Sequence, residues 1–244
     1  MKKILCLFGA LALVLTSCSN DDSPSSSDGL LKKTVITNSD GEKYTINYTY
    51  DGNKIVSAID DTGDVNAYYT YTGNLITKIE FKFPDGTIDQ INTYSYNADG
   101  KLTTFLRVEP NMDWGTKEVY TYNADGTITV KSYGGDSETQ TSEGSTSTVK
   151  FVNGEVSEII SESGSVSHKY TYDNKNNPTK NILGMDKIAF ADGEGNGVKF
   201  NILTDTSGDG DLWTNSTFTY NESGYPIKEV DTGSDSLGTS EYFY

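Results

Sequence analysis

Cysteine and histidine are nearly missing from this chain of 244 residues. It has two cysteines, Cys6 and Cys18, and a single histidine, His168. A CxxC redox site, a thiol nucleophile or an iron–sulfur centre therefore cannot be built from the residues after Cys18. A zinc site with two or more histidines is excluded too, and a Ser-His-Asp triad would have to use His168. We interpret His168 as a solvent-facing position on a strand.

Basic residues are also scarce. The chain has 35 acidic and 19 basic side chains, a net charge of −16. Without residues 1–17, which contain Lys2 and Lys3, the balance becomes 17 − 35 = −18. Such a charge repels phosphate backbones, so nucleic acid is excluded as a partner. It keeps the domain soluble, and it could also collect divalent cations.

The N-terminal segment predicts export. A cationic start and the apolar residues 4–15 match a secretory signal and are too short to span a bilayer. Leu-Thr-Ser-Cys at positions 15–18 resembles the lipobox of bacterial lipoproteins. That resemblance implies removal of residues 1–17, a diacylglycerol on the thiol of Cys18, and attachment to a membrane through lipid.

Residues 18–30 are rich in serine and acidic side chains, which predicts a flexible linker. Asp21 and Asp22 resemble the surface-export signal of Bacteroidota lipoproteins. This implies a lipid-anchored protein of the outer membrane that faces the cell surface; the alternative is one that faces the periplasm. Residues 31–244 are long enough to form a single domain with a core of its own.

A repeat of about 24 residues runs through residues 31–244, since eight steps cover the 194 residues from Tyr50 to Tyr244. Each unit has two bulky apolar residues separated by one position. The pairs are Tyr48/Tyr50, Tyr69/Tyr71, Tyr94/Tyr96, Tyr120/Tyr122, Val149/Phe151, Tyr170/Tyr172, Ile188/Phe190, Phe218/Tyr220 and Tyr242/Tyr244.

A tight turn follows almost every pair, and an apolar strand follows the turn. Turns such as Asp51-Gly52 and Asp192-Gly193 supply residues that tolerate positive φ. A second apolar residue four positions later would lie on the same strand face. Each unit is therefore predicted to be a β-hairpin. The apolar pairs are Ile55/Ile59, Leu75/Ile79, Leu102/Leu106, Val156/Ile160, Pro178/Ile182, Val198/Ile202 and Pro226/Val230.

The units resemble the YD repeats of secreted bacterial proteins, most closely at residues 48–51 and 170–173. They depart from that family because the arginine after its glycine is absent and most units carry Asn in place of Asp. The whole combination is more similar to an uncharacterised family of Bacteroidota lipoproteins with a porin-like domain. That resemblance covers residues 30–244 and implies a many-stranded barrel, but it implies no activity and no catalytic residues.

We therefore predict an all-β fold: an antiparallel meander of about eight hairpins in a closed or strongly curved barrel. Closure removes the two unpaired edges that a meander otherwise leaves. Outward positions such as Ser157 and Glu158 are polar, which favours a barrel in water over one that spans a membrane. An open twisted sheet is the alternative.

The chemistry of the chain points to three features. The tyrosine pairs recur in every unit, so we interpret them as core and not as a sugar-binding surface. Trp114 and Trp213 lie outside the pairs and are the candidates for an exposed binding platform. Residues 205–212 resemble a calcium loop of the EF-hand type without its final glutamate. Its candidate ligands are Asp205, Ser207, Asp209 and Asp211.

These features favour a non-catalytic binding or scaffolding module with a glycan or an envelope protein as its partner. The rival hypothesis is a carbohydrate-active hydrolase with two carboxylates, one of them in an apolar setting that raises its pKa. A third interpretation is a closed shell around a small apolar ligand. No cofactor is expected apart from calcium.

Overall fold

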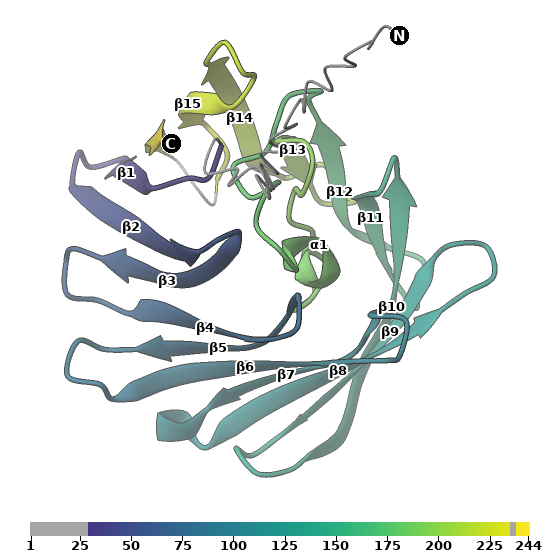
Figure 1. Cartoon of the computed structure of the whole chain (residues 1–244). Coiled ribbons are helices and arrows are strands. Elements are labelled where there is room, and N and C mark those ends of the chain that lie inside the picture. The colour runs from purple at the N-terminus through teal and green to yellow at the C-terminus, as the bar shows by residue number, and fades with distance from the viewer. Residues whose placement is uncertain (1–28, 235–237) are drawn as a thin grey trace, which may run out of the picture.

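The chain forms a closed antiparallel barrel of sixteen strands (Figure 1). The computed structural model describes residues 29–234 and 238–244. Each strand pairs with its neighbours in sequence, and β1 closes the barrel on β16. The predicted meander of hairpins is confirmed, and it forms a closed barrel and not an open sheet.

The strands are short and nearly continuous around the barrel. Besides them the described residues contain the 3-10 helix η1 (Pro110–Met112) and the helix α1 (Met185–Ile188). No described helix has the length and apolar character needed to cross a membrane. The strands are β1 (Lys33–Asn38), β2 (Lys43–Asp51), β3 (Lys54–Asp60), β4 (Asn66–Thr72), β5 (Leu75–Lys82), β6 (Ile88–Tyr96), β7 (Leu102–Glu109), β8 (Trp114–Tyr122), β9 (Ile128–Gly135), β10 (Gln140–Val152), β11 (Glu155–Ser161), β12 (Val166–Tyr172), β13 (Ile202–Thr206), β14 (Leu212–Tyr220), β15 (Pro226–Asp231) and β16 (Gly238–Phe243).

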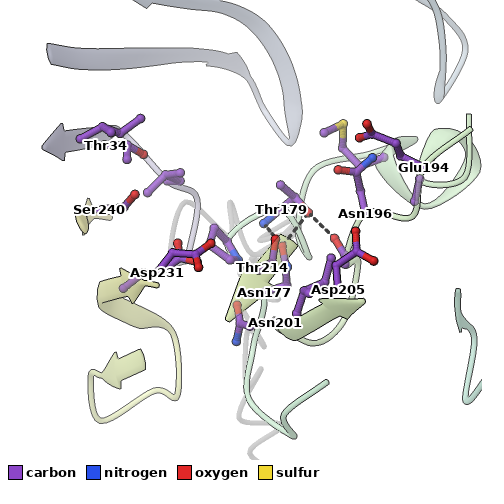
Figure 2. A pocket seen from close by; sticks show the side chains of 18 of the residues that line it. Thr34, Asn177, Thr179, Glu194, Asn196, Asn201, Asp205, Thr214, Asp231 and Ser240 are labelled. Atoms are coloured by element: carbon purple, nitrogen blue, oxygen red, sulfur yellow. Dashed lines mark hydrogen bonds between the residues drawn. The ribbon is translucent and has the colours of Figure 1, made fainter. Parts of the chain in front are cut away.

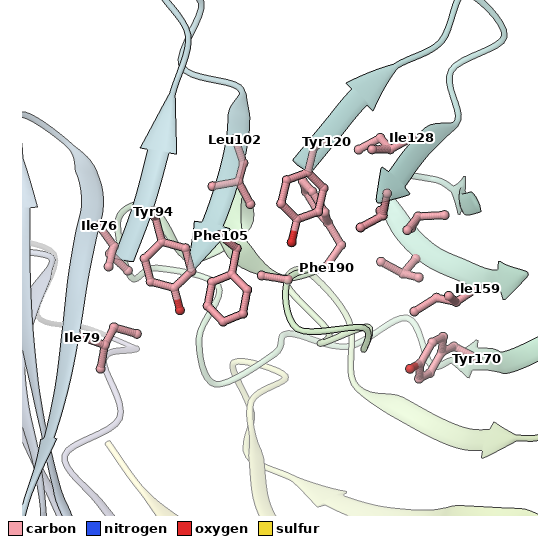
Figure 3. Packing of buried hydrophobic residues seen from close by; sticks show 14 of the residues in the cluster. Ile76, Ile79, Tyr94, Leu102, Phe105, Tyr120, Ile128, Ile159, Tyr170 and Phe190 are labelled. Atoms are coloured by element: carbon pink, nitrogen blue, oxygen red, sulfur yellow. The ribbon is translucent and has the colours of Figure 1, made fainter. Parts of the chain in front are cut away.

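The repeat pairs point into the barrel. Eight of the nine pairs lie on the even-numbered strands, with Tyr244 directly after β16, and six of these eight belong to the hydrophobic clusters. Figure 3 shows Tyr94, Phe105, Tyr120 and Phe190 turned toward one another. The interpretation as core is confirmed for these six pairs, whereas Phe218/Tyr220 and Tyr242/Tyr244 belong to neither cluster. Burial raises the pKa of all thirteen tyrosines in the repeat pairs.

The prediction that apolar residues four positions apart share a face is wrong for several strands. A β-bulge follows the first residue of β7, where Tyr96 pairs with Leu102 but Ser95 pairs with Thr104. Phe105 therefore faces inward at 0 % exposure, and Leu106 does not. Irregularities in β3, β5, β11 and β15, each next to the residue that pairs with the second member of a repeat pair, repeat this shift. Such bulges sharpen the local twist that a barrel wall requires.

Tyrosine hydroxyls join several hairpins to the hairpin before them. The Tyr96 hydroxyl donates to the carbonyl of Ile76 at 2.6 Å, and the Tyr172 hydroxyl donates to the carbonyl of Val156 at 2.8 Å. Tyr71 instead accepts a hydrogen bond from the backbone N–H of Ile55. In these three units the second tyrosine contacts the second residue of the preceding odd-numbered strand. The same contact recurs because the repeat does.

Residues 173–201 do not continue the repeat. The sequence predicts strands around Pro178/Ile182, Ile188/Phe190 and Val198, but this segment, here called the plug, lies inside the barrel and carries α1 (Figure 1). The ring of Phe190 packs edge-on against Tyr120 and Phe151. A buried position for Phe190 was correctly expected, but on the wrong element.

Buried polar contacts hold the plug in place. The carboxylate of Glu155 accepts hydrogen bonds from the backbone N–H groups of Val198, Lys199 and Phe200. At the other side Gly184 has a φ of +81°, and a Cβ there would lie 3.0 Å from the backbone nitrogen of Ile76. Only glycine adopts such a position easily, which explains the close approach of the plug to the wall.

The two ends of the barrel differ. The turns that follow the repeat pairs lie at the end that the plug fills, here called the plug end. Leu30 packs there with Ile55 and Ile182, and the Tyr50 hydroxyl donates to the carbonyl of Leu31 at 2.6 Å. The opposite turns, such as the one between β1 and β2, form the open end.

Charged side chains cover the outer wall. Lys150 on β10 and Glu158 on β11 form an ion pair of 3.2 Å across neighbouring strands, and Glu158 also lies opposite Lys169 on β12. On β5, Lys78 contacts Glu80 at 3.2 Å. The alternation of apolar inside and polar outside thus holds around much of the barrel.

Candidate binding cavity

A cavity of about 1290 Å³ occupies the part of the barrel interior that the plug leaves empty. Tyr94, Phe105 and Tyr170 line it on the side of the core. Ser39 and Asp40, in the turn between β1 and β2, line it as well. The cavity therefore extends from the aromatic core to the open end.

The plug supplies the polar floor of the cavity (Figure 2). The backbone N–H and the hydroxyl of Thr179 both donate to the Oδ1 of Asn177 at 2.8 Å. Asn177 in turn donates to the carbonyl of Phe200 at 3.1 Å. These local bonds fix the amide groups of the floor, so the cavity has a defined shape.

The wall formed by β14, β15 and β16 carries two carboxylates, Glu229 and Asp231. Ser216 donates to Glu229 at 2.6 Å, and the hydroxyl of Tyr242 donates to the same carboxylate. Asp231 accepts hydrogen bonds from two backbone N–H groups, of Asn215 at 2.9 Å and of Gly233 at 2.7 Å. Both carboxylates are held by their neighbours and face the cavity.

A side pocket of about 380 Å³ adjoins the cavity on the wall formed by β12, β13 and β14. His168 and Asp205 line it, with Nδ1 of the imidazole 3.0 Å from the carboxylate. The imidazole stacks on Tyr170, with ring centroids 5.7 Å apart, and contacts Trp213 at 4.6 Å. The interpretation of His168 as solvent-facing is wrong, because it pairs with an acid on β13 that is 37 residues away in sequence.

The two tryptophans lie at the open end but not on one platform. Trp213 is half-buried against His168, whereas Trp114 is 39 % exposed at the start of β8, with the guanidinium of Arg107 5.5 Å from its ring. Five strands, β9 to β13, separate them along the shorter way round the barrel. The structure thus brings Trp213 into the side pocket and leaves Trp114 on the rim.

The calcium candidates do not converge. Asp205 is engaged by His168, and Ser207, Asp209 and Asp211 belong to the turn between β13 and β14. In that turn the Ser207 hydroxyl accepts the backbone N–H of Asp211 at 2.9 Å. Among the described residues no group of three or more His, Cys, Asp or Glu side chains is placed to hold a metal. Calcium binding stays a prediction from the sequence and gains no geometric support.

Among the carboxyl groups of the described residues, only that of Glu118 has a raised pKa, and burial is the main cause. It accepts hydrogen bonds from the Tyr120 hydroxyl and from the backbone N–H of Asp192, the latter at 2.9 Å. Glu118 is not among the residues that line either described pocket. The hydrogen bond from Asp192 joins Glu118 to the plug. No described carboxyl group therefore combines a raised pKa with a place in a pocket, as the hydrolase hypothesis requires. The lipidation candidate Cys18 lies outside the described residues.

The fold and the cavity define a class: a closed sixteen-stranded barrel with an internal plug and an open-ended lumen, which is a porin-like architecture. No family model matches the sequence, and no curated protein matches it. Among solved structures, a porin-like protein from Bacteroides vulgatus is similar at a TM-score of 0.56 and 14 % identity, over 88 % of this chain and 98 % of that chain. A porin-like protein from Bacteroides uniformis gives a TM-score of 0.34 at 12 % identity, over 87 % and 97 % of the two chains. The likeness to the Bacteroides vulgatus protein shows the fold and no ligand.

Proposed function

We propose that this protein is a lipid-anchored, non-catalytic binding module of the outer membrane that takes a short glycan into the open half of its barrel. The observation that carries the proposal is the cavity of about 1290 Å³ between the aromatic core and the open end. Ligand sites generally have about 300–1000 Å³, so there is room for more than one sugar ring.

The lining suits a sugar better than an apolar ligand. Aromatic faces such as those of Tyr94 and Tyr170 lie on one side, and fixed amide and hydroxyl groups such as those of Asn177 and Thr179 lie on another. Sugar rings present both apolar C–H faces and hydroxyl groups, and they need both kinds of partner. A shell for a small apolar ligand would lack the polar floor.

The outer wall favours a barrel in water. Lys150 and Glu158 face outward as an ion pair, and a lysine on a lipid-facing strand costs about 2–4 kcal/mol at the bilayer midplane. The plug also lies inside the lumen. Membrane attachment is therefore assigned to Cys18, with the outer leaflet as the expected side and the periplasmic side as the alternative.

The start of the described chain lies at one end of the barrel. Leu30 and Leu31 are buried at the plug end. An anchor on Cys18 then holds the plug end toward the membrane and the open end toward the surroundings. A glycan could enter without passing the lipid surface.

The test is a panel of bacterial and host oligosaccharides, offered to the full chain in detergent and scored for both retention and cleavage. We expect retention without cleavage, and Trp213→Ala should weaken it up to about tenfold, since aromatic stacking contributes roughly 0.5–1.5 kcal/mol beyond the area it buries. Trp114→Ala is the comparison at the rim, where a smaller loss is expected. Cleavage products would show a hydrolase, and the absence of retention across the panel would contradict the proposal.

A further inference from the structure

The charged groups that line the cavity all have one sign. Among the described residues, six carboxylates line it and no lysine, arginine or histidine does. Two neighbouring cations reach them from outside the lining. Arg107 contacts Asp192 at 3.2 Å, and His168, when protonated, would pair with Asp205. Even with both pairs counted as neutral, 6 − 2 = 4 negative charges remain. The six are Asp40, Asp192, Glu194, Asp205, Glu229 and Asp231.

These carboxylates lie on two sides of the cavity. Figure 2 shows Asp231 near Ser240 and Thr34 on one side, with Asp205 and Glu194 on the other. Asp231 is 7 % exposed and is fixed by backbone N–H groups, so it cannot turn away to solvent. A ligand in the lumen meets negative charge on both walls, and the low-dielectric surroundings strengthen its effect.

A buried amide gives a second, independent sign of a hydrogen-bond donor in the ligand. The side chain of Asn201, at 2 % exposure, lines the cavity. Its Nδ2 donates to Asp173 at 2.9 Å and to the carbonyl of Asn176 at 3.3 Å. Its Oδ1 accepts no hydrogen bond from any described residue. This oxygen borders the cavity and is not sealed off from it, so a donor on a ligand can reach it.

Aromatic rings lie next to the carboxylates of the lining. In the side pocket Trp213 contacts His168, which stacks on Tyr170, and the carboxylates of Asp205 and Glu194 line the same space. A cation is attracted both by the face of an aromatic ring and by a carboxylate. An anionic sugar such as a uronic acid would be repelled by every charged group of the lining.

We propose that the lumen selects a cationic ligand, an oligosaccharide that carries free amino groups. This inference rests on the proposed glycan-binding function and names the class of glycan. The ammonium groups bind Asp205, Glu229 and Asp231 from the two walls, and the sugar rings lie against the aromatic side of the cavity. Acetylation of the amino groups removes the charge while the sugar backbone is unchanged.

The experiment compares three oligosaccharides of equal length by calorimetry on the full chain in detergent: glucosamine oligomers, the same oligomers with N-acetylated amines, and galacturonic acid oligomers. The amine form should bind at least about tenfold more tightly than the acetylated form, a typical effect of a charge-assisted contact. Raising the salt concentration should shrink this difference, because salt screens the attraction. No binding of the anionic form is expected.

The outcomes separate the two proposals. Binding of the acetylated form that is equal to or tighter than that of the amine form overturns the cationic ligand and leaves glycan binding intact. Failure of both neutral and cationic oligomers to bind contradicts both proposals.

Matched variants locate the effect. Glu229→Gln keeps the shape of the wall and should reduce binding of the amine form severalfold, with little change for the acetylated form. Glu194→Gln is a second variant, since Glu194 is exposed on the plug and makes no hydrogen bond with a described residue, so its replacement leaves folding intact. Glu158→Gln, on the outer wall, is the control and should change neither. If Glu158→Gln weakens amine binding as much as the two cavity variants do, the net charge of the protein and not the cavity is responsible, and the proposal fails.

Discussion

The half of the barrel interior next to the plug and the half next to the open end come from the same strands but differ in chemistry. Near the plug, repeated aromatic pairs fill the space with side chains such as Tyr120 and Phe151. Near the open end, the strands continue with Asn92, Asp205 and Glu229, and the space stays open. The difference teaches that the repeat builds the core and the aromatic side of the cavity, while positions that depart from the repeat supply its charged groups.

The largest effect should come from the core half. Phe105→Ala removes a side chain with 0 % exposure and leaves a cavity, which typically costs about 3–5 kcal/mol of unfolding free energy. Thr214→Ala in the open half is the matched substitution and should cost less than about 0.5 kcal/mol. Urea unfolding measures both. Equal losses would contradict the division of the interior into two halves.

Alkaline pH should act on the core half next. Burial raises the pKa of Tyr69 and Tyr71 to about 12 from an ordinary value of 10.0. A raised pKa in the folded state favours the folded state below pH 10, and this contribution is lost as pH rises through 12. We expect the unfolding free energy to fall between pH 10 and about pH 12, while the absorbance of the tyrosine phenolate rises. Full titration of all tyrosines near pH 10 with no loss of stability would show that the pairs are not buried.

Smaller effects should come from the tyrosine hydroxyls that join hairpins. Tyr96→Phe removes the 2.6 Å hydrogen bond to Ile76 and leaves a carbonyl without its partner, so we expect a loss of about 1–2 kcal/mol. The control is Tyr68→Phe, on the outward face of β4, where less than about 0.5 kcal/mol is expected. Thermal unfolding of the two variants side by side decides whether the hydroxyl contributes.

The barrel was predictable because its information is local and repeated. Tyrosine pairs, positive-φ turns such as the one at Asn153 and Gly154, and alternating strands each point to a hairpin. The bulges were missed because one extra residue after a turn has no clear sign in the sequence. The plug was missed because Ile188/Phe190 followed by Asp192-Gly193 imitates a repeat unit. The run of Asn176, Asn177 and Pro178 was the available sign that strands end there.

The binding cavity was only partly predictable. Trp213 was singled out because it lies outside the repeat, and it does line the side pocket. Its partner His168 is 45 residues away in sequence, and the contact between them depends on the neighbourhood of β12 and β14 across β13. The carboxylates of the lining are ordinary members of an acidic sequence. Their shared location emerges only from the closure of the barrel.

The most direct test of the account is to place a bulky side chain in the lumen by a substitution on one strand of the wall. Ser240 and Glu241 are neighbours on β16, and Ser240 lines the cavity while Glu241 is exposed. Ser240→Trp should abolish oligosaccharide binding, and Glu241→Trp should leave it unchanged. Circular dichroism should show that both variants are folded. Undiminished binding by Ser240→Trp would show that the open half of the lumen is not the binding site.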